Sequence, residues 1–61
     1  MSLDQLFRRE FFLKVLMTIG VVSLKTFTGF SEAHIEDMAL GNTEISNDEI
    51  ESIFKALAGG A

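Results

Sequence analysis

The sequence predicts an all-α protein, with one long N-terminal apolar helix of a kind that can span a membrane, followed by two short amphipathic helices. Three observations predict this fold class. There is no proline in the 61 residues, so no residue removes a backbone donor from a helix. Serine residues stand at three positions that suit helix N-caps. The C-terminal third carries apolar residues at the three- and four-residue spacing of a helix face.

The long helix is expected to begin after Ser2 and to run without interruption to Gly29. Ser2 can cap it, with Gln5 three residues later as in a capping box, and Gly29 is the expected helix stop. Its apolar residues spread around the helical wheel: Leu3, Phe7, Phe11, Phe12, Val15, Leu16, Ile19, Val22 and Leu24. A helix that is apolar nearly all round is buried in protein or in membrane.

The two short helices have clearer boundaries. Ser31 is expected to cap a helix over 32–40, which Gly41-Asn42 ends. Ser46-Asn47-Asp48-Glu49 is a capping box with acidic residues in the first turn, and it predicts the start of the last helix. Gly59-Gly60 is the expected stop of that helix.

The last helix carries an apolar stripe at i, i+3, i+4 and i+7 spacing, made of Ile50, Ile53, Phe54 and Leu57. Two roles are open for it: a docking face for a partner protein, or part of an internal core with Ile35, Met38 and Leu40. At about 1.5–3 kcal/mol each, so few buried side chains barely offset the ordering entropy of two short helices. The stripe is therefore predicted to be a partner-docking face.

Length and composition limit how this chain can be stabilised. A chain of 61 residues forms at most one small domain, which buries only about 60% of its unfolded surface. Without cysteine and with His34 as the single histidine, disulfides and a structural zinc are excluded as supports. Yet 48% of the residues are hydrophobic. A compact helical mini-domain is one explanation, and apolar surface covered by lipid or by a partner protein is the preferred one.

Charge divides the chain into two predicted segments, 1–30 and 31–61. The first has four basic side chains against two acidic ones, and the second has one basic side chain against seven acidic ones. Segment 1–30 therefore resembles a signal anchor, an apolar helix with a positive balance, and 31–61 is an acidic helical docking segment. The positive-inside rule places the N-terminus on the cytoplasmic side and the acidic segment outside. The acidic balance argues against nucleic-acid binding, which needs clustered Lys and Arg.

An arginine pair precedes the apolar run, in the order Arg8-Arg9-Glu10-Phe11-Phe12-Leu13-Lys14. This segment resembles the twin-arginine (Tat) export signal, in which an arginine pair is followed by a variable residue, Phe, Leu and Lys. Arg8, Arg9 and Phe11 match that pattern, Phe12 replaces its leucine, and Lys14 comes one residue late. The resemblance covers residues 7–25. The alternative is an ordinary helix whose arginines face water or phospholipid head groups.

The apolar run is short for a membrane span. Val15–Leu24 supplies ten uncharged residues, and the window Phe11–Phe30 reaches the roughly 20 that a bilayer requires only by including Lys14 and Lys25. The nearest signal-peptidase pattern, Ser31-Glu32-Ala33, is poor, which favours a retained signal anchor over a cleaved signal. The predicted location is the bacterial inner membrane, with the C-terminal part in the periplasm.

Sites for chemistry are not evident in the sequence. His34 near Glu32, Glu36 and Asp37 gives an incomplete metal site, and a solvent-facing or helix-capping histidine is the preferred interpretation. The segment 44–49 is similar to the back half of an EF-hand loop, but the acids of the loop start are missing, so it is interpreted as a helix cap. No set of residues suits a nucleophile, a phosphate loop or paired catalytic carboxylates. We therefore predict neither catalytic residues nor a cofactor in this chain.

Two functions from different classes remain. The Tat resemblance implies a small accessory or anchor subunit of a larger membrane-associated or periplasmic complex, since Tat substrates are typically redox enzymes that carry cofactors. The partner would then be a larger protein subunit, and the enzyme would lie in that partner. The alternative is a free-standing helical protein–protein interaction module or an oligomeric regulator.

Overall fold

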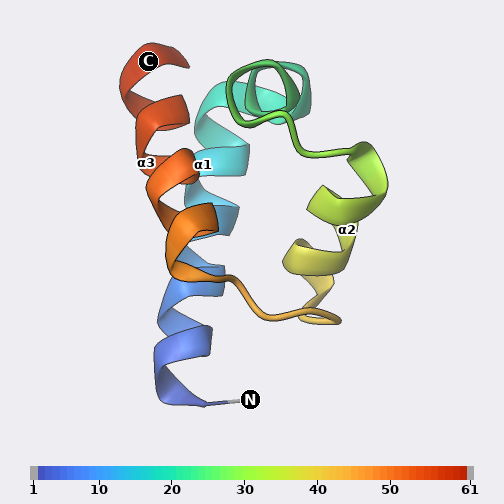
Figure 1. Ribbon diagram of the computed structural model, residues 1–61, viewed down its shortest axis with the longest axis vertical. Coiled ribbons are helices and arrows are strands. Elements are labelled where there is room, and N and C mark those ends of the chain that lie inside the picture. The colour runs from blue at the N-terminus through green and yellow to red at the C-terminus, as the bar shows by residue number, and fades with distance from the viewer. Residues whose placement is uncertain (1, 61) are drawn as a thin grey trace.

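The computed structural model describes residues 2–60 and contains three helices, α1 (Leu3–Thr28), α2 (Glu32–Leu40) and α3 (Asn47–Gly60). The all-α fold, with one long N-terminal helix and two shorter ones, is as predicted. α2 returns along the molecule, and α3 then runs beside the first part of α1 (Figure 1). Met1 and Ala61, the outer ends of the two predicted segments, lie outside the described residues.

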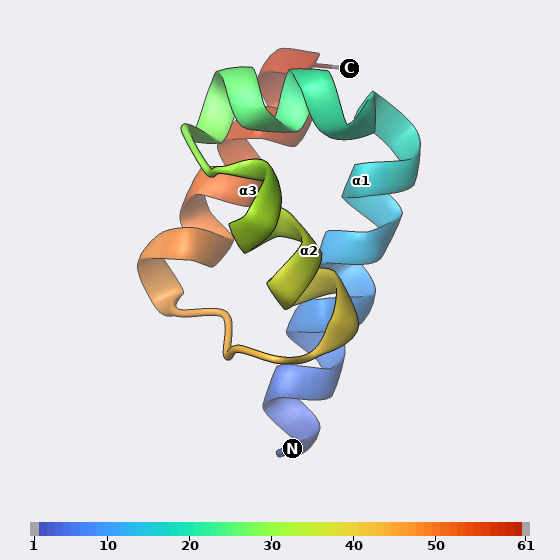
Figure 2. The same ribbon diagram turned by 90° about the vertical axis from the view of Figure 1, so that its right-hand side faces the viewer.

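α1 is bent at Gly20, which was not expected from the sequence. Figure 2 shows the helix turning sharply, so that its last part crosses the upper end of the molecule. Gly20 has φ 85° and ψ 164°, a conformation that is essentially restricted to glycine. Glycine lacks a Cβ, so it can interrupt the helix without steric strain. α1 therefore consists of a straight part before the bend, residues 3–19, and a short part after it, residues 21–28.

The predicted serine N-caps are confirmed, but the side chain of Gln5 bonds to the backbone of Ile45 and does not complete a capping box with Ser2. Ser2, Ser31 and Ser46 each accept a hydrogen bond on the side-chain oxygen from the backbone N–H three residues on, at 3.1–3.2 Å. The Ser46 backbone N–H also donates to Glu49 at 2.8 Å, which completes the reciprocal capping box. Left-handed Gly29 and Gly41 end α1 and α2.

The C-terminal end of α3 differs from the prediction, because the helix continues through Gly59 to Gly60 instead of stopping there. The packing at Gly59 gives a physical reason for glycine at this position. A Cβ built on Gly59 would lie only 3.2 Å from Cε1 of Phe27. Gly59 thus allows the end of α3 to approach the last part of α1 closely, and it does not end the helix.

One hydrophobic core joins the two predicted segments. Phe12, Val15 and Leu24 of α1 are buried in it, on both sides of the bend. The other core residues come from α2, the α2–α3 loop and α3: Ile35, Met38, Ile45, Ile53 and Ala56. Residues before and after the bend contact the same cluster, so the bend folds the last part of α1 over the core. The other elements, α2, the loop and α3, lie against one side of the straight part.

Candidate functional site

Arg8 lies against the α2–α3 loop. Its Nη1 donates to the Ile45 carbonyl oxygen at 2.9 Å, and its Nη2 donates to Oδ1 of Asn47 at 2.6 Å. Its Nε pairs with Oδ2 of Asp4 at 3.0 Å, one turn earlier in α1. All three guanidinium nitrogens therefore have a polar partner, and the side chain holds the loop and the start of α3 against α1.

Arg9 and Gln5 complete this contact. Arg9 Nε donates to the carbonyl oxygen of Ala39 at 2.8 Å, in the last turn of α2, where carbonyls lack helical partners. The Gln5 amide forms a two-bond pair with the backbone of Ile45, donating to its oxygen at 3.1 Å and accepting from its nitrogen at 2.8 Å. We call Gln5, Arg8 and Arg9 the polar clamp. It fixes the end of α2 and the loop to the N-terminal turns of α1.

The other residues of the Tat-like motif point in different directions. Phe12 is fully buried in the core, and Lys14 is exposed. Phe11 is half-buried and stacks on Phe54 of α3, with ring centroids 4.5 Å apart. Arg8, Arg9, Phe11 and Phe12 thus have intramolecular contacts in this fold, and the export role of the motif stays a prediction.

The predicted docking stripe of α3 faces mainly inward. Ile53 is fully buried, in the same cluster as Ile35 and Met38, and Ile50 and Leu57 are half-buried against that cluster. Phe54 is 55% exposed and Leu40 is 60% exposed. Of the four docking residues, Phe54 is therefore the one whose side chain is open to a partner.

His34 and Glu49 form a pair between α2 and α3 that the sequence did not reveal. His34 Nε2 contacts Oε2 of Glu49, and the His34 and Phe30 rings lie nearly perpendicular to one another, with centroids 5.2 Å apart. Partial burial by itself would raise the pKa of Glu49. The hydrogen bonds from Ser46 and His34, with the charge of His34, outweigh burial and lower the pKa of Glu49 below its ordinary value. The glutamate was recognisable from its capping box, but its partner depends on how α2 folds back.

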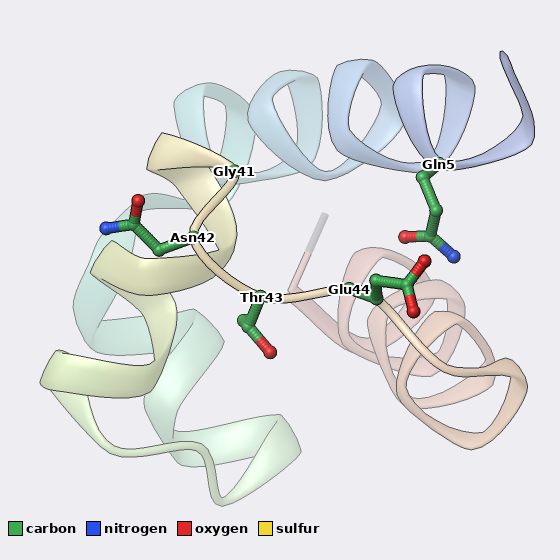
Figure 3. Close-up of a pocket in the computed structure, with 5 residues that line it drawn as sticks. All are labelled: Gln5, Gly41, Asn42, Thr43 and Glu44. Atoms are coloured by element: carbon green, nitrogen blue, oxygen red, sulfur yellow. The ribbon is translucent and has the colours of Figure 1, made fainter. Parts of the chain in front are cut away.

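A small cavity lies beside the polar clamp. It has a volume of about 180 Å³ and is lined by Gln5 and the loop residues 41–44 (Figure 3). In the close-up, the side chains of Gln5 and Glu44 extend toward one another, whereas Asn42 points away. The amide of Gln5 is already engaged with Ile45. The cavity therefore lacks the converging free polar groups that a binding pocket for a small molecule needs.

The side of α1 that faces away from α2 and α3 carries several exposed apolar side chains. On the straight part of the helix, Leu3 is 67% exposed, Phe7 is 65% exposed and Met17 is 87% exposed. Helical spacing places these residues in one row. We define the outer face of α1 as this row with its neighbours on the same side: Leu3, Leu6, Phe7, Glu10, Leu13, Lys14 and Met17. It has only two charged residues, and these lie in its middle.

By length and composition, α1 is long and apolar enough to cross a membrane; it is the one helix in the described part of the chain that satisfies this test. Comparison of the chain with protein-family models, with curated proteins and with solved structures found no match. The candidate function therefore depends on the geometry alone.

Proposed function

We propose that this chain is a non-catalytic helical interaction module, in which α2, α3 and the loop hold α1 in place so that its outer face can bind another protein surface. One observation carries this proposal: Leu3, Phe7 and Met17 are largely exposed in a row, on a helix whose opposite side is fixed by the core and the polar clamp. Large apolar side chains that are exposed on one face of a helix are typical of interaction sites.

The contacts of α1 with the core and the polar clamp order its outer face before a partner binds. A surface that is already ordered loses little conformational entropy when it binds. Phe12 and Val15 anchor the straight part of α1 in the core, and Arg8 and Arg9 hold its first turns. Each apolar side chain that a partner then covers contributes about 1.5–3 kcal/mol if it becomes fully buried.

A photo-crosslinking amino acid at Met17 tests the proposal in cells. The matched control places the same amino acid at Glu36, an exposed position of α2. We expect discrete covalent adducts from position 17 and few or none from position 36. Adducts that are absent from position 17, or equally frequent at both positions, would contradict the proposal.

The second candidate function is a membrane-anchored accessory subunit of a larger complex, with a redox enzyme as the partner implied by the Tat resemblance. The length and apolar composition of α1 favour it. In that state the acidic C-terminal part would lie in the periplasm, and Phe54 would be one of its docking residues. However, residues 3–19 rise only about 26 Å at 1.5 Å per residue, against a hydrocarbon core of about 30 Å. Spanning would thus require Gly20 to become helical.

Membrane extraction distinguishes the two functions. A chain anchored by α1 stays in the membrane pellet after washing at high pH and is released by detergent, whereas an interaction module is released by the wash. The double variant Arg8→Lys, Arg9→Lys separates export from folding. Loss of export with retained helical content would favour the Tat-dependent anchor, and unchanged location would count against it.

A further inference from the structure

We infer that the outer face of α1 pairs with the same face of a second copy, with the two helices antiparallel and a two-fold axis level with residue 12. This inference rests on the proposed function, since it names the partner of the same surface. It depends on the spacing of four outer-face residues and on the order of their charges.

The four residues are Phe7, Glu10, Lys14 and Met17, all of them exposed. They are separated by three, four and three residues, which is the spacing of the seam between two packed helices. All four lie in the straight part of α1, before the bend at Gly20. The outer face therefore presents a short seam that no other element in the described part of the chain covers.

The two central residues of the seam have opposite charges. In an antiparallel pair centred on residue 12, Glu10 lies opposite Lys14 of the second copy, and Lys14 lies opposite Glu10 of the second copy. A parallel pair would place Glu10 against Glu10 and Lys14 against Lys14. Within residues 2–60, neither side chain takes part in an ion pair. The charges thus complement a second copy in one orientation and repel it in the other.

The outer residues of the seam support the same register. When Glu10 meets Lys14 of the second copy, Phe7 meets Met17 of that copy, and the same contact is repeated on the other side of the axis. Methionine sulfur packs favourably against aromatic rings. These apolar contacts flank the two ion pairs and shield them from water.

A lipid surface suits this arrangement less well than a second copy. An interfacial helix carries its charges, mainly Lys and Arg, on the polar side and places its apolar side in the lipid. Here Glu10 lies in the middle of the apolar face, and the chain has a net charge of −4. In the antiparallel pair the same glutamate has a cation opposite it. The seam is short, so we expect association that is weak and depends on concentration.

Charge reversal in the full chain tests the pairing. We expect the wild type to self-associate in sedimentation equilibrium, and Glu10→Lys and Lys14→Glu each to weaken association at least tenfold. An equimolar mixture of these two variants should associate again, because one seam is then positive and the other negative. The double variant Glu10→Lys, Lys14→Glu should associate like the wild type. A mixture that stays monomeric, or single variants that associate like the wild type, would overturn the inference.

Disulfide trapping tests the orientation. The chain has no cysteine, so Phe7→Cys and Met17→Cys introduce the only thiols. On mild oxidation of a mixture of the two variants, we expect mainly the disulfide that joins position 7 of one copy to position 17 of the other. Disulfides between identical positions would indicate a parallel pair and overturn the inference.

The two proposals fail in different ways. If position 17 forms adducts in cells with a different protein, while the purified chain is monomeric and insensitive to both charge reversals, the interaction module stands and the antiparallel pair falls. If position 17 forms no adducts and the chain is monomeric, both fall. Circular dichroism of each variant shows whether the helices are intact, which is expected because Glu10 and Lys14 are exposed.

Discussion

The inner face of α1, which packs against α2, α3 and the loop, and its outer face both carry large apolar side chains, but their surroundings differ. On the inner face Phe12 is fully buried in the core, and on the outer face Phe7 and Met17 are largely exposed. A chain of 61 residues cannot cover an apolar helix on all sides, because small folds bury too little of their surface. An apolar residue in α1 therefore contributes to stability or to binding according to the face on which it lies.

The largest expected effect comes from Phe12→Ala, which would break the inner face. Replacing a buried phenylalanine with alanine costs about 3–5 kcal/mol. A domain of this size has roughly 3–9 kcal/mol of total stability, so the variant should be largely unfolded at 37 °C. Urea unfolding followed by circular dichroism measures the loss.

Met17→Ala is the matched control on the outer face. We expect its free energy of unfolding to change by less than about 0.5 kcal/mol, because an exposed position away from specific contacts tolerates substitution. Similar losses in the two variants would show that the inner and outer faces are wrongly assigned.

Gly20→Ala tests where the two faces end. At a regular helical position, alanine in place of glycine stabilises by about 1 kcal/mol. At the φ and ψ of Gly20, alanine should instead destabilise by about 1–3 kcal/mol. The sign of the change in the free energy of unfolding, measured with urea, therefore decides whether α1 is bent. Thr18→Ala, an exposed position two residues earlier, is the control and should have a small effect.

The elements of this fold could be predicted because their signals are local. Ser31 and Ser46 precede their helices by one position, and Gly29 and Gly41 follow theirs. The bend at Gly20 could not be predicted, because a glycine within an apolar run is also compatible with a straight helix. What makes the bent conformation favourable is tertiary: it brings Leu24 into the same core as Phe12.

The candidate site was harder to predict than the fold. The apolar character of α1 all round was clear from the sequence, but the choice of its free side depends on where α2 and α3 pack. The stripe of α3 was predicted to bind a partner, and three of its four residues instead face the core, leaving Phe54 exposed. The export motif at Arg8 and Arg9 stays a prediction. Their hydrogen bonds to Ile45 and Ala39 could not be predicted, because they join residues more than 25 positions apart.

Arg9→Ala would weaken the polar edge of the inner face. The variant loses the hydrogen bond to the Ala39 carbonyl and exposes the end of α2, so we expect a loss of about 1–2 kcal/mol. Lys14→Ala, which removes an exposed charge on the outer face, is the control and should change stability little. Hydrogen exchange of the amides in residues 39–46 should accelerate in the first variant and not in the second. Equal exchange in both would show that Arg9 does not hold the end of α2.

The smallest effect concerns Glu49 of α3. Its contact with His34 of α2 involves neither face of α1. Its pKa is lowered in the folded state from an ordinary value of 4.5, despite the opposing effect of burial, by the hydrogen bonds from Ser46 and His34. A lowered folded pKa means that the carboxylate stabilises the fold above pH 4.5, and that this contribution is lost as the pH falls through the folded pKa.

We expect Glu49→Gln to cost about 1 kcal/mol at pH 6, as for the loss of a capping interaction. The cost should be smaller at pH 3 than at pH 6, because the lower pH favours the protonated, neutral form of Glu49. Glu51→Gln, on the exposed side of α3, is the control. If the cost of Glu49→Gln is the same at both pH values, the carboxylate charge does not stabilise the contact between α2 and α3.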